Sequence, residues 1–204
     1  MQRRGHALSA GFLLLQILVG YEWFASGLTK LAHGDFPAGL AADLRERAQV
    51  AAPWYGHFLR SVVIPHASGF GYAIELTELL SGVALIATAV AGLLLLRREQ
   101  GIDTRFHLWA AGLAAAAAFA GLVLAVNFVL ANRMGFSPVA ADSFDEGVGL
   151  DSLLVGIQLV LLGVALTSLA PLWAREAHTG HRADARYEVG SPTGQATPVP
   201  PSPQ

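Results

Sequence analysis

Cysteine is absent from the 204-residue sequence. This absence excludes disulfides, thiolate zinc or iron–sulfur sites and redox dithiols, and with them the thiol-based membrane oxidoreductases. Charge is also scarce, because Asp, Glu, Lys and Arg make up only 14% of the residues. Thirteen basic against fifteen acidic side chains give a formal net charge of −2. Such a balance lacks the basic footprint of a nucleic-acid-binding protein, so no nucleic-acid partner is expected.

Hydrophobic residues, in contrast, make up 53% of the chain, and the mean hydropathy is +0.48. A soluble domain of this length needs a charged surface over its core, so this composition indicates a lipid bilayer as the surroundings. Apolar stretches of about 20 residues, long enough to cross the hydrocarbon, occur four times: residues 7–29, 71–96, 107–131 and 149–173. We therefore predict an all-α fold, a four-helix transmembrane bundle within residues 1–174.

The arginines predict the orientation of this bundle. They lie before the first span, between the second and third spans and after the fourth, whereas the link after the third span is mainly acidic. By the positive-inside rule both termini are cytoplasmic, and residues 175–204, rich in Gly, Pro, Ser and Thr, form a disordered cytoplasmic tail. A second interpretation treats the first span as a signal peptide, since Arg3 and Arg4 precede it and Ala25-Ser26-Gly27 resembles a cleavage site.

The outer loop, residues 31–70, is long for a plain connection and is expected to carry structure of its own. Pro37 starts a predicted helix in which Leu40, Leu44 and Val50 share one side. A second apolar piece runs over residues 54–64 and stops at Pro65. Both pieces are predicted as interfacial helices over the mouth of the bundle, and a solvated loop with aromatic anchors is the alternative.

Three carboxylates fall inside the predicted spans, where an ionisable group is costly unless it is paired or solvated. They are Glu22, Glu75 and Glu78. Counting along the helices puts all three at a similar depth, in the same leaflet as Asn127 and Asp151. The sequence thus predicts one polar cavity, at whose mouth the carboxylates meet a cation, and the candidate cations are Lys30, Arg60 and Arg133. Alternatively, one carboxyl group is protonated, because neighbouring like charges favour its neutral form. A structural role is the alternative for each carboxylate, and helix-end hydrogen bonding is favoured for Asn127 and Asp151.

Other patterns favour packing over chemistry. Gly20, Gly27 and Gly82 allow helices to approach closely. Only His6 and His107 begin spans on a common side, so no haem site is expected, and the histidines of the outer loop have no zinc-ligand spacing. No metal is therefore expected.

Several short motifs, in this order, resemble the DoxX/DoxD family of small four-helix membrane proteins: Gly27-Leu-Thr-Lys30-Leu31, Pro53-Trp-Tyr-Gly-His-Phe-Leu59, Ile64-Pro65-His66 and Glu78-Leu-Leu-Ser-Gly82-Val-Ala-Leu85. Asn127 and Gly149-Leu150-Asp151 also match its pattern. The family includes the small membrane subunit of thiosulfate:quinone oxidoreductase. The resemblance implies a quinone-linked redox role in a prokaryotic plasma membrane, with Glu78 and Lys30 as the functional residues. Glu22 and Glu75 match no position of the family.

One functional hypothesis is therefore a quinone-reactive subunit of an oxidoreductase. A quinone site needs an apolar slot, hydrogen-bond partners and a proton donor. Glu78, with Glu75 or Glu22 behind it, is the expected donor. Trp23 and Phe24 are the expected walls of the ring slot, and Asn127 and Asp151 are further candidates for binding the cofactor. Lys30, Arg60 and Arg133 would collect an inorganic sulfur anion such as thiosulfate at the mouth.

The chain has no cysteine and no convincing haem pair, so electrons would pass directly from substrate to quinone or arrive from a partner. A second subunit or a soluble redox partner is expected, and a homo-oligomer stays open. The alternative is a non-catalytic membrane scaffold or a small transporter, so the sequence does not decide whether the chain is an enzyme.

Overall fold

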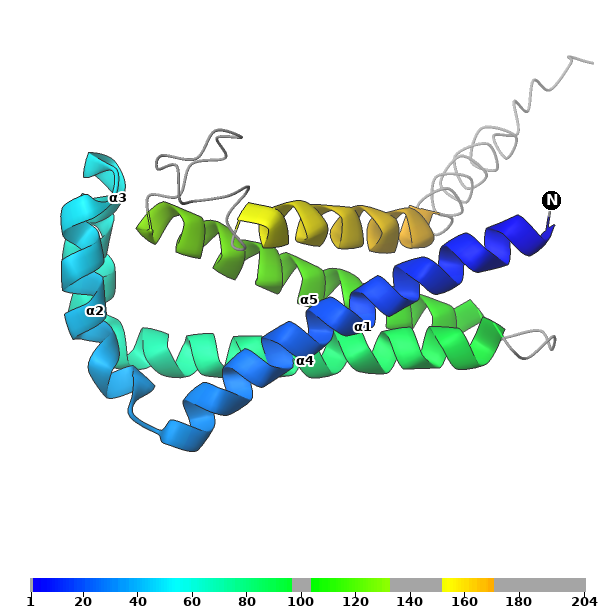
Figure 1. The fold of residues 1–204 in the computed structure, drawn as a ribbon, viewed down its shortest axis with the longest axis horizontal. Coiled ribbons are helices and arrows are strands. Elements are labelled where there is room, and N and C mark those ends of the chain that lie inside the picture. The colour runs from blue at the N-terminus through cyan, green and yellow to red at the C-terminus, as the bar shows by residue number, and fades with distance from the viewer. Residues whose placement is uncertain (1, 97–103, 133–151, 171–204) are drawn as a thin grey trace, which may run out of the picture. The chain divides into compact units, whose positions relative to one another are not determined.

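The computed structural model describes residues 2–96, 104–132 and 152–170. The chain divides into two units, Met1–Ser168 and Leu169–Gln204. Every regular element in the described part of the chain is helical, which confirms the predicted all-α class. The labelled helices are α1 (Gln2–His33), α2 (Phe36–Val50), α3 (Pro53–Phe58), α4 (Ala67–Leu96) and α5 (Thr104–Ala131) (Figure 1). A further helix covers Ser152–Ala170.

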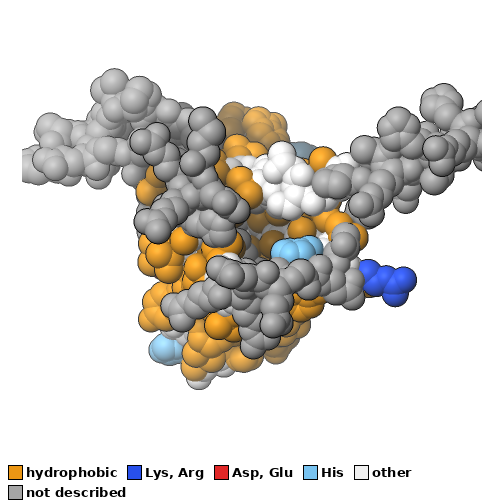
Figure 2. Space-filling view, turned by 90° about the vertical axis from the view of Figure 1, so that its right-hand side faces the viewer, with side chains coloured by type: hydrophobic (Ala, Val, Ile, Leu, Met, Phe, Trp, Pro, Cys, Tyr) orange, Lys and Arg blue, Asp and Glu red, His pale blue; other side chains and the backbone are white. Residues whose placement is uncertain are grey.

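Four helical stretches are long and apolar enough to cross a membrane: Ser9–His33, Pro53–Leu96, Arg105–Ala131 and Ser152–Ala170. Their outward faces carry large apolar side chains, such as Leu18 and Leu80, which are 65% and 64% exposed. Figure 2 views the molecule from the end where α1 begins and α4 ends, and in this view too most of the described surface is hydrophobic. A helix that is apolar on its outer face as well as its inner face suits lipid, so the chain is a multi-pass membrane protein.

Helix α1 crosses α4 (Figure 1), and the two run antiparallel with their backbones close together. A Cβ atom added at Gly27 would lie 2.6 Å from the backbone nitrogen of Leu79, and one at Gly82 would lie 2.7 Å from the carbonyl oxygen of Gly20. Only glycine permits such an approach, which confirms the packing role predicted for Gly20, Gly27 and Gly82.

The segment between α1 and α4 holds α2 and α3, which lie across one end of the long helices (Figure 1). Gly34, with φ of 73°, ends α1 and starts the turn into α2, because glycine adopts this left-handed conformation without strain. The buried stripe of α2 consists of Pro37, Leu40, Leu44 and Ala48. The prediction that Val50 belongs to it was wrong: Val50 is 54% exposed, since it lies ten and six positions from the two leucines and off their face.

The second apolar piece of the loop does not stop at Pro65, which corrects the sequence-based boundary. A π-helical turn, η1 (Leu59–Val63), and a 3₁₀ turn, η2 (Ile64–His66), carry the chain from α3 directly into α4. Pro65 lies in the first positions of the 3₁₀ turn, where its missing N–H costs no hydrogen bond. The proline therefore marks a change of helix type and not an end.

The buried side chains form two clusters. One fills the centre of the bundle around Trp23, Leu85 and Ala118. The other lies beneath α2 and α3, around Leu40, Leu44 and Leu59. The second cluster holds the loop helices against the membrane-spanning helices, and the candidate site lies beside it.

Candidate functional site

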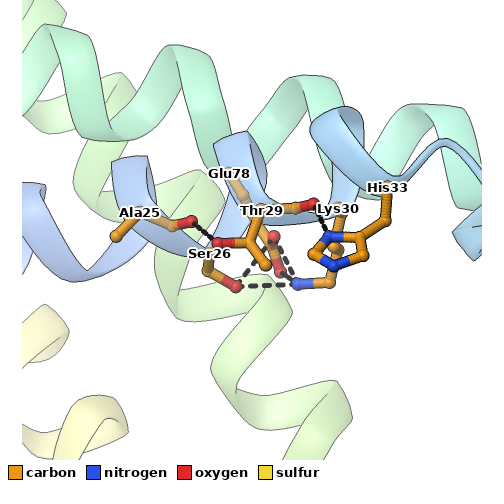
Figure 3. A network of polar contacts seen from close by, with 6 residues as sticks. All are labelled: Ala25, Ser26, Thr29, Lys30, His33 and Glu78. Atoms are coloured by element: carbon orange, nitrogen blue, oxygen red, sulfur yellow. Dashed lines mark hydrogen bonds and ion pairs between the residues drawn. The ribbon is translucent and has the colours of Figure 1, made fainter.

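The most concentrated polar contacts join α1 and α4 through Lys30, Ser26 and Glu78 (Figure 3). The Lys30 ammonium nitrogen donates to Glu78 Oε1 at 2.7 Å and to Oε2 at 2.5 Å. It also lies 2.7 Å from Ser26 Oγ, and that hydroxyl donates to Glu78 Oε2 at 3.1 Å. The carboxylate of Glu78 is thus held by two donors from one face of α1.

Burial makes this ion pair costly to disturb. The side chain of Glu78 is fully buried, whereas that of Lys30 keeps 21% of its surface exposed. Lys30 is also the single lysine of the sequence, all other basic residues being arginines or histidines. A buried carboxylate that loses its partner is left as an uncompensated charge, so the stability of the α1–α4 pair depends on Lys30.

Glu75 lies one turn before Glu78 on α4 and is also buried, with 3% of its surface exposed. Its Oε1 atom has no hydrogen-bond partner among the described residues. A buried polar atom without a partner is rare in proteins, which makes Glu75 a candidate for a role beyond packing. Two of the three predicted carboxylates therefore lie on one buried stripe of α4.

A cavity of about 460 Å³ opens beside the ion pair, between the loop helices and the helices α4 and α5. We call it the Lys30 cavity. Lys30 lies on its wall, with the ammonium nitrogen 5.2 Å from the centre of the Phe36 ring. Its other aromatic lining residues are Tyr55, Phe58, Phe70 and Phe128, and its other polar ones are Asp43, Arg47, Thr77, Asn127 and Asn132. The cavity is therefore mainly apolar and aromatic, with polar groups on its wall.

Tyr55 and Asn127 connect α3 to α5 across this cavity. The Tyr55 hydroxyl donates to Asn127 Oδ1 at 2.9 Å, and the amide of Asn127 donates to the carbonyl of Val123 at 2.7 Å. The sequence favoured a helix-end hydrogen bond for Asn127, and the structure shows such bonds together with a place on the cavity wall.

Several predicted site residues lie elsewhere. The single cavity predicted for the three carboxylates is not seen: Glu75 and Glu78 are buried on α4 and do not line the Lys30 cavity, and Glu22 is exposed, because equal depth did not mean the same face. Arg60 is exposed, and its guanidinium donates to the carbonyl of Ala48 at 2.8 Å, so it fastens η1 to the end of α2. Arg133 and Asp151 lie outside the described residues.

The expected ring walls, Trp23 and Phe24, do not line the Lys30 cavity either. Trp23 is 2% exposed and contacts Gln158, which is fully buried in the centre of the bundle. An indole N–H only donates, so the Gln158 amide oxygen accepts from it, and the amide nitrogen lies 3.2 Å from the carbonyl of Ala118. Trp23 thus has a structural role, and phenylalanines from the loop helices, α4 and α5 take its place.

Ser26, Tyr55 and Phe36 were missed by the sequence analysis as site residues. Ser26 had a signal, because it precedes Lys30 by four positions and therefore shares its helix face. Tyr55 and Phe36 had none, since their contacts with Asn127 and Lys30 depend on how α2 and α3 fold back. Among the described residues no group of three His, Asp or Glu side chains is placed to hold a metal ion.

Comparisons with models of protein families, with curated proteins and with solved structures yield no match to this chain. The geometry of the Lys30 cavity therefore has to carry the functional argument.

Proposed function

We propose that this chain is the integral membrane subunit of a quinone-linked oxidoreductase, and that the Lys30 cavity receives the quinone ring. The observation that carries the proposal is the place of Lys30: on the wall of an aromatic cavity, bound to a fully buried carboxylate. The volume of about 460 Å³ falls within the usual range of small-molecule sites. The sequence resemblance to the DoxX/DoxD family supports the same class of ligand.

The residues present fit a quinone. Its ring is flat and apolar, and side chains such as Phe36, Phe70 and Phe128 provide faces for it. Its two carbonyl oxygens only accept hydrogen bonds. The donors on the cavity wall are the Lys30 ammonium and the Tyr55 hydroxyl, and a bound quinone would replace their present acceptors Ser26 and Asn127.

Reduction of a quinone to a quinol takes up two electrons and two protons. Lys30 is placed to deliver a proton from its ammonium group, and solvent can return that proton because 21% of the Lys30 side chain is exposed; the Glu78 carboxylate holds the ammonium group in place. Glu75, one turn along α4, is the next carboxyl group in the same buried stripe. The two electrons would come from an inorganic sulfur anion, oxidised directly or by a partner subunit, as when two thiosulfate ions couple to tetrathionate. Arg47 on the cavity wall is paired with Asp43.

We place the protein in a prokaryotic plasma membrane with both termini cytoplasmic. The loop helices and the Lys30 cavity then lie on the outer side, where a second subunit or soluble partner would deliver electrons.

The test measures the binding of decylubiquinone to the purified protein in mild detergent. Quenching of tryptophan fluorescence reports the binding. The double variant Lys30→Met/Glu78→Leu removes the ion pair without leaving a buried charge, and we expect its Kd to rise by at least about tenfold. Glu22→Gln, on the exposed face of α1, serves as the matched control and should bind like the wild type.

Lys30 offers a second readout because it is the single lysine. An amine-reactive reagent marks Lys30 and the N-terminal amine, and bound decylubiquinone should protect only Lys30, as measured by peptide mass mapping. Equal modification with and without the quinone, together with unchanged binding in the double variant, would reject the quinone site. The scaffold or transporter would then become the preferred function.

A further inference from the structure

A second cavity, of about 690 Å³, lies where α1 begins, α4 ends and α5 begins, next to the last turns of the helix Ser152–Ala170. It lies toward the end of the molecule that Figure 2 views. We call it the Gln16 cavity. It exists because small residues face one another across the helices: Gly92, Ala110, Ala111, Ala114 and Ala165.

The Gln16 cavity differs from the Lys30 cavity in its charge. Its polar lining residues are Ser9, Gln16, Thr88, His107 and Ser168, and no Asp, Glu, Lys or Arg is among the described residues that line it. Charged ligands are costly to bury without a partner, so this lining selects an uncharged molecule.

Gln16 gives the cavity a specific hydrogen-bonding group. Its side chain is 5% exposed and is held in place because its amide nitrogen donates to the Leu85 carbonyl at 3.0 Å and to Thr88 Oγ1 at 2.8 Å. Its amide oxygen receives no hydrogen bond from the described residues, and it is not among the atoms that are closed off from solvent. A fixed acceptor without a donor therefore lies on the wall of an apolar cavity.

We propose that the Gln16 cavity binds an uncharged, lipid-soluble molecule that carries a hydroxyl group. The hydroxyl donates to the Gln16 amide oxygen, and the apolar part lies along the small residues of α5. Long-chain alcohols and quinols share this chemistry. The site lies at the opposite end of α1 from Lys30, so it goes beyond the proposed function and does not depend on it.

The experiment uses a matched pair of probes: a twelve-carbon alcohol carrying a mid-chain diazirine, and its methyl ether, which lacks the donor. Both are photo-cross-linked to the full chain in detergent, and the labelled peptides are mapped. We expect the alcohol to label residues lining the Gln16 cavity with an affinity about fivefold to tenfold higher than the ether, the value of one neutral hydrogen bond.

Two variants separate the hydrogen bond from the space. Gln16→Leu should lower the affinity of the alcohol to that of the ether and leave the ether unchanged, which also shows that the cavity is intact. Ala114→Phe fills the cavity and should abolish saturable labelling by both probes. Ala116→Phe, on the exposed face of α5, is the control and should change neither.

Competition against the alcohol probe identifies which kind of molecule supplies the hydroxyl group. Displacement of the alcohol probe by decylubiquinol assigns a quinol, and displacement by dodecanol alone assigns a simple hydroxylated lipid. Equal affinity of alcohol and ether in the wild type would overturn the proposal, because the cavity would then accept any acyl chain. Labelling confined to other parts of the chain would overturn it as well.

Discussion

Lys30 and Glu78 illustrate how one contact combines structural and chemical roles. The carboxylate is fully buried, so it needs the ammonium group to remain charged at that depth, and Lys30 in turn reaches the wall of a cavity. Ser26, one turn before Lys30, fixes the geometry by contacting both partners.

We expect Lys30→Met alone to lower the free energy of unfolding by about 3–5 kcal/mol, because Glu78 is left buried without its partner. The double variant Lys30→Met/Glu78→Leu should lie close to the wild type. Both are measured by SDS titration of the protein in detergent micelles. If single and double variants were equally unstable, packing and not charge would explain the loss.

At the residue level, the sequence predicted side-chain contacts best where residue spacing identified the helix face. It predicted them worst where only the depth of a residue in the membrane was counted. The expected contact between a buried carboxylate and a cation is made by Glu78 and Lys30. Glu22 was assigned by depth alone, and it lies on an exposed face. The contact of Lys30 with Phe36 depends on how α2 folds back toward α1, and no local sequence pattern encodes that fold-back.

Among the helices, the close approach of α1 and α4 depends on glycine at specific positions. Gly27→Ala places a methyl group 2.6 Å from a backbone nitrogen of α4, and backbone cannot move aside cheaply. We expect a loss of about 1–3 kcal/mol in the free energy of unfolding. Gly11→Ala, in the same helix with nothing within 4 Å, is the control and should leave stability unchanged or raise it by up to about 1 kcal/mol, because alanine is the better helix former.

Helix α2 is held by its buried leucines, so the contribution of its packing to the stability of the protein can be measured separately. Leu44→Ala should cost about 2–5 kcal/mol, since Leu44 is 8% exposed within the cluster beneath the loop helices. Val50→Ala should be nearly neutral because Val50 is 54% exposed. Thermal unfolding in detergent compares the two, and a large effect at Val50 would show that its surface is covered by a partner.

At the scale of the whole chain, the four membrane-spanning helices followed from composition and length alone, because crossing hydrocarbon demands long apolar stretches. The Lys30 cavity could not be predicted in this way. It forms between α2, α3, α4 and α5, and its volume depends on side chains that are far apart in the sequence.

The orientation of the chain remains a prediction from the arginines. A reporter enzyme that is active only outside the cytoplasm, fused after Gln204, should be inactive, and a reporter active only in the cytoplasm should be active there. The reverse pattern would place the loop helices and the Lys30 cavity on the cytoplasmic side.

The separation of the ion-pair partners has a consequence for biogenesis. Lys30 leaves the ribosome 48 residues before Glu78, so at typical rates of synthesis it waits about 2–10 s for its counterion. During that interval the nascent chain carries an unpaired ammonium group near the end of its first membrane segment, within reach of insertion and quality-control factors. A chain without Glu78 would never leave that state, so its steady-state level in cells should fall even where the purified protein still folds.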